Sequence, residues 1–473
     1  YQGGFIWDFV DQSVRRYTED GREFYAYGGD FNAYDASDQN FCDNGLISPD
    51  RVLNPHADEV AYYYQNIWVK PVDLKKGIVS VYNENFFRDL SDYYAQWELL
   101  VDGKVAKTGI VADVKVTPQQ TANLQLGYSL DGICACKEVL LNVYFKLKQT
   151  EAFLPAGHTV AKEQLAIQEY KAPEDLMQDC KIAHINTPFP IVKDNDTGYL
   201  IVEGEKFHID INRKSGFISL YDVNGQSPNF WRAPTDNDLG SKLQIKYRVW
   251  KNPEMKLTSL EHKTEGEFII VEAKYDMPDV SAKLALTYRI NRYGAVEVTQ
   301  QMTAGKGVEV PNMFRFGMRA ELNKSLANIQ YYGRGPIENY SDRKSSTLIG
   351  RYNQTVEEQF YSFIRPQENG TKSDIRWWNQ VNKSGNGVQF VADAPFSASA
   401  LYYSIESLDE GLAKSNRHSE LVEKRECVNL CIDKVQMGLS GVNTWGALPL
   451  EPYQVPYKDY TFKFVIKPVQ HQF

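Results

Sequence analysis

Cysteine and histidine are scarce in this sequence of 473 residues, which contains six and seven of them. No Cys-x-x-Cys pair is present, and the histidines do not cluster with metal-ligand spacing. Cys134 and Cys136 flank one alanine in a predicted strand, where two side chains on the same face bridge poorly. We therefore expect free buried thiols rather than a disulfide framework or a zinc ribbon.

Long apolar runs and an excess of positive charge are also missing. No stretch approaches the roughly 18 apolar residues that a membrane-spanning helix needs. The 52 basic and 61 acidic residues give a net charge of −9, which argues against nucleic acid or an anionic membrane surface as the partner. A hydrophobic content of 42% with 24% charged residues is typical of globular proteins. At one domain per roughly 150 residues, the length predicts about three domains.

Aromatic residues are abundant, at 30 Tyr, 23 Phe and 8 Trp. This composition favours β-structure and surfaces that bind sugars or peptides, although a large β-sandwich without a ligand has it too. Residues 1–50 combine aromatics with Gly and Asp and show little periodicity, as in the loops of a functional site. A helix is expected next, with Asn54 as its cap, Pro55 in its first turn and Gln65 near its end.

Strand patterns begin near residue 67. The run 97–101 leads into Asp102-Gly103, a strong two-residue hairpin signal. Short strands and turns at regular spacing predict an immunoglobulin-like β-sandwich over 67–172. The proline-bearing stretch 173–190 is the expected linker.

From 191 to 473 apolar and polar residues alternate at period two in many runs, which predicts a large antiparallel β-sandwich. Asn224-Gly225 predicts a hairpin turn within it. The clearest alternating runs are Phe207/Ile209/Ile211, Leu284/Leu286/Tyr288/Ile290, Val428/Leu430/Ile432 and Tyr460/Phe462/Phe464/Ile466.

Six segments in a particular order resemble the long, multi-domain β-galactosidases of glycoside hydrolase family 2. The segments are Gly3–Gln12, Tyr27–Leu46, Phe230–Asp238, Gly333–Tyr340, Pro366–Gly370 and Gln436–Trp445. The resemblance implies that 1–66 is the C-terminal remnant of a catalytic (β/α)8 barrel and that 191–473 is a galactose-mutarotase-like β-sandwich. The fold class is therefore expected to be mainly β, with the immunoglobulin-like sandwich between these two parts.

The resemblance also implies a reaction. Retaining glycosidases use two carboxylates, one as nucleophile and one as acid/base. In the family both are glutamates that precede the segment matching residues 1–12, so no catalytic residue is expected in this chain. The chain begins at Tyr1 rather than Met, as expected of a C-terminal portion cut from a longer enzyme. We expect it to be inactive by itself and to need the missing N-terminal half as its partner.

Other carboxylates are better explained by structural roles. Glu84 follows a predicted strand and lies at its edge. Glu338 and Asp342 occupy a Gly-Pro loop, where a spacing of four has no helical meaning. Asp236 and Asp238 flank an asparagine in a predicted turn, where such side chains bond the local backbone.

Three residues of the N-terminal part are implied to line the galactose pocket. Trp7 lies where a barrel strand ends, and active sites of barrels lie at that face. Phe41, through its carbonyl oxygen, and Asn44, through its side chain, match part of a sodium site that touches the sugar. Neutral oxygens suit a singly charged cation. The full enzyme is also expected to use Mg²⁺, and the alternative for each residue is core packing or a plain turn.

Two residues of the C-terminal part complete the predicted site. Trp445 matches a tryptophan on which the leaving sugar stacks, but Ser440 and Val442 replace a Gly-Gly-Asp pattern of the family before it. Glu368 lies in a loop that approaches the active site. His418 is expected to be hydrogen-bonded within the large sandwich.

The resulting hypothesis is the C-terminal portion of a retaining β-galactosidase that cleaves terminal β-D-galactosides. The alternatives are another family 2 specificity, such as a β-glucuronidase or β-mannosidase, and a non-catalytic carbohydrate-binding or mutarotase-like module. A mutarotase needs a His and Glu pair, for which His262 and His418 qualify only by residue type. A homo-oligomer is common in the family. The compartment and the physiological galactoside do not follow from the sequence.

Overall fold

A computed structural model describes residues 3–177, 187–194, 198–439, 443 and 446–469. Strands predominate, and all the ladders between named strands in these residues are antiparallel, as the alternating patterns predict. The mainly β fold class is therefore confirmed. In the described part of the chain, no helix is both long and apolar enough to cross a membrane.

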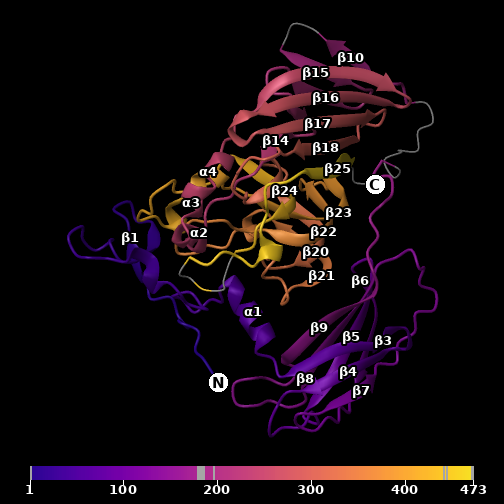
Figure 1. Ribbon diagram of the computed structural model, residues 1–473. Helices are drawn as coiled ribbons and strands as arrows, with labels where there is room; N and C mark the ends of the chain where they lie inside the picture. The colour runs from indigo at the N-terminus through magenta and orange to yellow at the C-terminus, as the bar shows by residue number, and fades with distance from the viewer. Residues whose placement is uncertain (1–2, 178–186, 195–197, 440–442, 444–445, 470–473) are drawn as a thin grey trace.

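The C-terminal part of the chain forms one sheet of 16 strands. Its strands are β10 (Ile191–Asp194), β11 (Tyr199–Glu203), β12 (His208–Asn212), β13 (Ile218–Leu220), β14 (Val223–Asn229), β15 (Lys256–Glu265), β16 (Phe268–Met277), β17 (Ala282–Asn291), β18 (Val296–Thr303), β19 (Arg315–Asn323), β20 (Asn328–Gly335), β21 (Leu348–Thr355), β22 (Lys372–Val381), β23 (Gly387–Leu401), β24 (Cys427–Gln436) and β25 (Tyr460–Val469). The main path runs β10-β11-β12-β13-β14-β19-β24-β23-β25-β18-β17-β16-β15, and β22, β20 and β21 branch from β23 (Figure 1).

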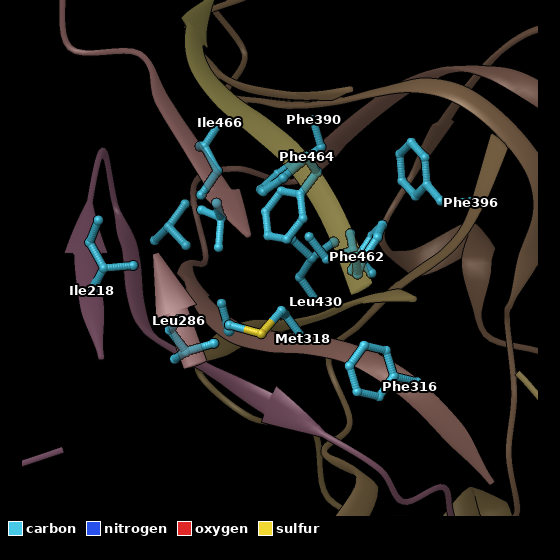
Figure 2. Close-up of a cluster of buried hydrophobic side chains, with 14 of the residues drawn as sticks. Ile218, Leu286, Phe316, Met318, Phe390, Phe396, Leu430, Phe462, Phe464 and Ile466 are labelled. Atoms are coloured by element: carbon cyan, nitrogen blue, oxygen red, sulfur yellow. The ribbon is translucent and has the colours of Figure 1, made fainter. Parts of the chain in front are cut away.

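The sheet curls over a single apolar core. Ile218 of β13 and Leu286 of β17 come from distant parts of the strand path, yet their side chains join one cluster with Leu430, Phe462 and Phe464 (Figure 2). All five side chains are buried, as the period-two pattern predicts. Burial at about 25 cal/mol per Å² of apolar surface makes this core the main source of stability for the sheet.

One predicted hairpin turn in this sheet is misplaced. The chain reverses between β13 and β14 at Tyr221 and Asp222, which both have positive φ angles of 50° and 64°. Asn224-Gly225 lies instead inside β14, beside a register shift against β19. The reversal occurs earlier because Leu220 and Val223 must both face the core.

Residues 67–168 form two smaller antiparallel sheets. Their strands are β3 (Ile67–Asp73), β4 (Ile78–Asn83), β5 (Tyr93–Val101), β6 (Lys104–Val111), β7 (Thr121–Gln125), β8 (Val139–Leu147) and β9 (Thr159–Gln168). The sheet orders are β3-β4-β7 and β6-β5-β8-β9, and the two sheets share one core. The predicted hairpin at Asp102-Gly103 joins β5 to β6, with positive φ angles of 46° and 75°.

The expectation for Cys134 and Cys136 is wrong, because the structure joins them in a disulfide with a Cα–Cα distance of 5.2 Å. In a strand, residues two apart lie about 6.6 Å apart and point away from the chain in parallel. These two residues instead lie in the turns between β7 and β8, which bring them closer. Cys42, Cys427 and Cys431 are free thiols, and only Cys431 is fully buried.

The N-terminal part contains β1 (Val14–Tyr17), β2 (Glu23–Ala26), the 3-10 helix η1 (Gln39–Cys42) and the helix α1 (Pro55–Tyr63). Val10 and Ile47 form a parallel bridge, so two extended segments run side by side before the chain enters α1. Parallel segments followed by a helix are the repeating unit of a (β/α)8 barrel. This geometry agrees with the resemblance for 1–66.

The helix is confirmed, with Asn54 at its N-cap position and Pro55 as its first residue, but the Asn54 side chain does not cap it. The amide of Asn54 makes no capping hydrogen bond and instead donates to the Asp11 carboxylate at 3.0 Å and to the Gly45 carbonyl at 2.8 Å. The Asn54 Oδ1 also accepts from the Tyr361 hydroxyl at 2.5 Å. Tertiary partners therefore compete successfully with the helix end for this side chain.

The N-terminal part is fastened to the large sheet by polar contacts. Glu59 of α1 accepts hydrogen bonds from the Ser345 and Ser346 amides at 2.9 Å each. His418 contacts Asp30 with its Nε2 3.1 Å from the carboxylate, and the ring packs between Phe24 and Tyr27. The expectation that His418 bonds within the sandwich is therefore wrong. Its partner Asp30 lies 388 positions away in the sequence, so no local pattern could indicate it.

Candidate functional site

A cavity of about 730 Å³ lies where the N-terminal part meets the loops of the large sheet. Three short elements on the sheet side are nearby, namely the helices α2 (Asp236–Gly240) and α3 (Leu243–Lys246) and the 3-10 helix η4 (Arg248–Trp250). Figure 1 shows α2 and α3 on the side of the sheet that faces the N-terminal part. The walls mix aromatic, amide and carboxylate groups, as in sites that bind hydroxyl-rich ligands.

Trp7 contributes an aromatic face to this cavity. Its side chain lines the cavity and is 76% exposed, so core packing does not explain its position. The next residue, Asp8, donates its amide to the Asn44 carbonyl at 2.9 Å, which ties the Trp7 segment to the neighbouring extended segment. The predicted site residues Trp7 and Asn44 are thus brought together by backbone pairing.

Phe41 and Asn44 also line the cavity, and the Asn44 amide donates to the Phe41 carbonyl. The two oxygens of the predicted sodium site, Phe41 O and Asn44 Oδ1, therefore belong to neighbouring groups. A sodium ion bound by these two oxygens stays a prediction, since the Asn44 group that meets the Phe41 carbonyl is its amide nitrogen.

Asp11 holds this loop in place, a role that sequence reasoning missed. Its buried carboxylate accepts from the Gly45 amide at 2.7 Å and from the Asn54 amide at 3.0 Å. Burial raises the pKa of Asp11, and these two hydrogen bonds oppose the rise. The Nε2 of His56 lies 2.9 Å from the carbonyl oxygen of the same Gly45. Burial lowers the pKa of His56.

Asp43 is the cavity carboxylate with the most unusual surroundings. One oxygen accepts from the Ser13 hydroxyl at 2.5 Å, while Oδ2 is buried and has no hydrogen-bond partner among the residues that the structure describes. Burial raises the pKa of Asp43 to about 6. Sequence reasoning passed over this residue, although it stands inside the Phe41-Cys42-Asp43-Asn44 segment.

Replacing Asp43 with asparagine is expected to stabilise the chain by about 1 kcal/mol at pH 8, after allowance for the solvent that still reaches the side chain. Because the folded pKa lies above the ordinary value, the cost of the charge is present above about pH 6 and disappears as the pH falls through it. The two proteins should therefore have equal stability near pH 4. Urea unfolding at a series of pH values measures this, and a gain that persists at pH 4 would contradict it.

Glu368 reaches the cavity from the large sheet with its carboxylate already engaged. Its Oε2 accepts from Arg315 at 2.7 Å, and its Oε1 accepts from Thr371 at 3.1 Å and from Gln436 at 3.0 Å. Arg315 also contacts Asp433 at 3.1 Å. These partners already bond both carboxylate oxygens of Glu368. A direct contact between Glu368 and a sugar therefore stays a prediction.

The other carboxylates considered from the sequence have structural partners. Glu338 is buried, accepts from the Gly370 amide at 2.9 Å and pairs with Arg343. Asp236 begins α2 rather than a simple turn, because Thr235 and Asp238 form a capping box there. Asp236 also accepts from Asn40 at 2.9 Å.

Glu84 does not line the cavity, and its Oε2 accepts a hydrogen bond from the Trp68 indole at 2.5 Å. Trp445, Ser440 and Val442 lie outside the described residues. Within the part of the chain that the structure covers, no three His, Cys, Asp or Glu side chains gather as a metal site.

Described residues from all six segments that carried the resemblance line this cavity, and further contacts hold the segments in place. Gln12 at the end of the first of them hydrogen-bonds Asp8, and Tyr27 of the second exchanges hydrogen bonds with the Arg417 backbone. Arg232 and Asp238 of the third form a buried bidentate ion pair, and Arg232 also donates to the Met437 carbonyl at 2.7 Å. Their spacing in the sequence thus reflects assembly of one site from separate loops.

A polar and aromatic cavity between a barrel end and β-sandwiches is the arrangement that the resemblance to multi-domain glycoside hydrolases predicts. Residues 1–69 match the family model "Glycosyl hydrolases family 2, TIM barrel domain". Residues 79–168 match "Beta-galactosidase, domain 4", and residues 203–466, more than half of the chain, match "Beta galactosidase small chain". The chain therefore belongs to the β-galactosidase family of glycoside hydrolase family 2 and corresponds to its C-terminal portion.

Individual relatives agree with this assignment. The chain is 31% identical over 479 residues to a β-galactosidase of Priestia megaterium, a match that covers 99% of this chain and 45% of the relative. A β-galactosidase of Streptococcus thermophilus is 29% identical, with 99% and 44% of the two chains covered. The chain thus spans about 45% of the length of these relatives.

Among solved structures, the galactose 1-epimerase of Lactobacillus acidophilus NCFM is 8% identical with a TM-score of 0.32. The match covers 61% of this chain and 100% of the epimerase.

Proposed function

We propose that this chain supplies one wall of the galactose pocket and the leaving-group side of a retaining β-galactosidase that hydrolyses terminal β-D-galactosides. The single observation that supports this most is the exposed Trp7 on the wall of the 730 Å³ cavity, beside Phe41 and Asn44. An indole face can pack against the C–H face of a galactose ring, while the surrounding amides and carboxylates bond its hydroxyls.

The loop residues hold the binding groups in position. Asp11 fixes the backbone at Gly45, so the adjacent Asn44 side chain keeps its direction. A sodium ion held by Phe41 O and Asn44 Oδ1 would supply positive charge beside a sugar hydroxyl, and its remaining ligands would come from elsewhere in the enzyme. Mg²⁺ is proposed for the full enzyme only.

The reacting carboxylates are proposed to lie in the barrel portion that precedes these residues in the longer relatives. Of the cavity carboxylates, Asp11, Glu338 and Glu368 accept hydrogen bonds at both oxygens. Asp236 accepts at Oδ2 and lies near Lys414 at 3.5 Å, and Asp43 bonds Ser13. A general acid and a nucleophile facing one glycosidic bond need carboxylates free to react with it, about 5–5.5 Å apart in a retaining enzyme.

The chain by itself is expected to release no nitrophenol from nitrophenyl β-D-galactoside above the rate in buffer. Enzymes of this kind accelerate hydrolysis by at least about 10⁶-fold, so even a trace of intrinsic activity would be visible. Polypeptide that also contains the family's preceding barrel portion should hydrolyse the galactoside. Turnover by the chain alone would overturn the placement of the glutamates.

A panel of nitrophenyl glucuronide and mannoside on the longer polypeptide tests the alternative specificities. A preference for either sugar over galactoside would overturn the proposed substrate. Polarimetry of fresh α-galactose tests the mutarotase alternative. His262 is exposed on the edge strand β15 and His418 contacts Asp30, so we expect anomers to equilibrate at the buffer rate.

A further inference from the structure

A second cavity, of about 360 Å³, adjoins the sheet side of the first. Gln244 of α3 lines both cavities, so its side chain lies where the two cavities meet. Galactose placed against Trp7 and Asn44 lies on the N-terminal side of the first cavity, and the rest of a longer substrate would extend toward Gln244. The residues that line the second cavity include Trp231, Gln244, Arg248, Lys251, Gly411 and Leu412.

Gln244 presents an unused hydrogen-bond acceptor where the two cavities meet. The side chain is only 7% exposed, and its Nε2 donates to the Leu412 carbonyl at 3.3 Å. Its Oε1 has no hydrogen-bond partner among the described residues. A buried carbonyl oxygen without a partner costs free energy, so the position favours a ligand that brings a hydroxyl.

The walls of the second cavity are held by one buried carboxylate. Asp409 Oδ2 accepts from the Trp231 indole at 2.8 Å and contacts Lys251 Nζ at 2.8 Å. Its Oδ1 accepts from the Gly411 amide at 2.7 Å. These bonds hold Trp231, Lys251 and Gly411 in place through Asp409 before any ligand binds. Binding would therefore require little reorganisation of the cavity walls.

The charge of this cavity is opposite to that of the whole chain. Two basic residues, Arg248 and Lys251, line it, although the chain carries a net charge of −9. Asp409 neutralises Lys251, but the Arg248 guanidinium makes no ion pair or hydrogen bond with any residue that the structure describes. A guanidinium with free donors binds carboxylates and sulfates through paired hydrogen bonds.

We infer that the second cavity is an additional sugar subsite on the leaving-group side, and that it takes an acidic hexose bearing a carboxylate or sulfate. Arg248 holds the anionic group, the Gln244 carbonyl accepts a ring hydroxyl, and Leu412 covers the apolar face of the sugar. This inference rests on the proposed function, because the galactosyl end of the same substrate occupies the first cavity. The substrate class is therefore a β-galactoside extended by an acidic sugar.

Ligand-observed NMR titration of the 473-residue chain tests the subsite without any hydrolysis. The probes are glucuronate, glucose 6-sulfate, neutral glucose and inorganic sulfate. We expect at least one acidic sugar to bind, neutral glucose to bind at least about tenfold more weakly and inorganic sulfate to bind more weakly than the acidic sugar. The acidic sugar that binds identifies which anion the site prefers.

Arg248→Ala should weaken binding of the acidic sugar by about tenfold or more, since it removes a charge-assisted hydrogen bond. Gln244→Leu should reduce the advantage of the acidic sugar over inorganic sulfate. Lys246→Ala is the matched control, because Lys246 lies on the same segment but lines a different cavity. Its effect should stay below about twofold, and thermal unfolding checks that each variant is folded.

Binding of neither acidic sugar would overturn the inference, as would binding unaffected by Arg248→Ala. Equal affinities for inorganic sulfate and the acidic sugar would show an anion site with no sugar recognition. Failure of the proposed function is seen separately, in the nitrophenyl-galactoside assay.

Discussion

Replacing Arg315 with methionine is expected to lower the free energy of unfolding by about 3–5 kcal/mol. Arg315 is 1% exposed and lies between two buried carboxylates, with 2.7 Å to Glu368 and 3.1 Å to Asp433. Removal of the guanidinium leaves both without their cation in a region that water does not reach. The loss is large because the remaining charges are buried rather than because the ion pairs are strong.

The pH dependence of this variant separates charge from packing. Burial raises the pKa of Asp433 to about 7 and Arg315 opposes the rise, so loss of Arg315 should raise the pKa further. A carboxylate with a raised folded pKa destabilises the protein above that pKa, and this cost disappears as the pH falls through it. The deficit of Arg315→Met should therefore be largest near pH 8 and smaller near pH 6.

Arg319→Met is the matched control for this experiment. Arg319 lies on the same strand, β19, and pairs with Glu406, but its side chain is 39% exposed. Exposed ion pairs contribute about 0–1 kcal/mol, so this variant should lose less than 1 kcal/mol. Urea unfolding curves measure both variants, and similar losses for the two would contradict the argument.

Gly45→Ala is expected to destabilise the N-terminal part by about 3 kcal/mol, at the upper end for overpacking. A Cβ at position 45 would lie 2.1 Å from the Asp11 amide nitrogen and 2.6 Å from the Ile47 carbonyl oxygen. These neighbours are backbone atoms of the paired extended segments and cannot rotate away. The pairing of Val10 with Ile47 would have to open, and the cavity wall at Asn44 would open with it.

Hydrogen exchange of the backbone amides measures this effect locally. In Gly45→Ala, protection should fall at Asp11 and Ile47, whose amides take part in this pairing. Gly350→Ala is the control, because a Cβ there has its nearest neighbour at 3.4 Å, an ordinary contact with Tyr352. Unchanged protection in Gly45→Ala would show that the segment is not held as described.

Features that depend on neighbours in the sequence were predicted well. The alternation in β17 and β25 gave the buried face of each strand, because side chains of a strand point to opposite faces whatever its partner is. Asp102-Gly103 was found because its positive φ angles are a local property of a tight turn. The ordered segments that resemble the family identified Trp7, Phe41 and Asn44 as site residues. All three line the cavity.

Features that depend on distant partners were missed or misplaced. Asn54 takes the predicted N-cap position, but its side chain bonds Asp11, Gly45 and Tyr361 instead of the helix end. His418 contacts Asp30 across 388 positions, a separation at which no local pattern carries information. The disulfide between Cys134 and Cys136 depends on turns in a segment for which the sequence predicted a strand.

Local chemistry alone thus specifies that this protein is mainly β, where its strands alternate and which family it belongs to, because these depend on residue types and their order. Only the folded chain decides which charges are buried together, as Arg315, Glu368 and Asp433 are, and that Gln244 lines two adjoining cavities. The physical reason is that burial and long-range hydrogen bonds arise when segments far apart in the chain pack, and the environment of each polar group is set by that packing.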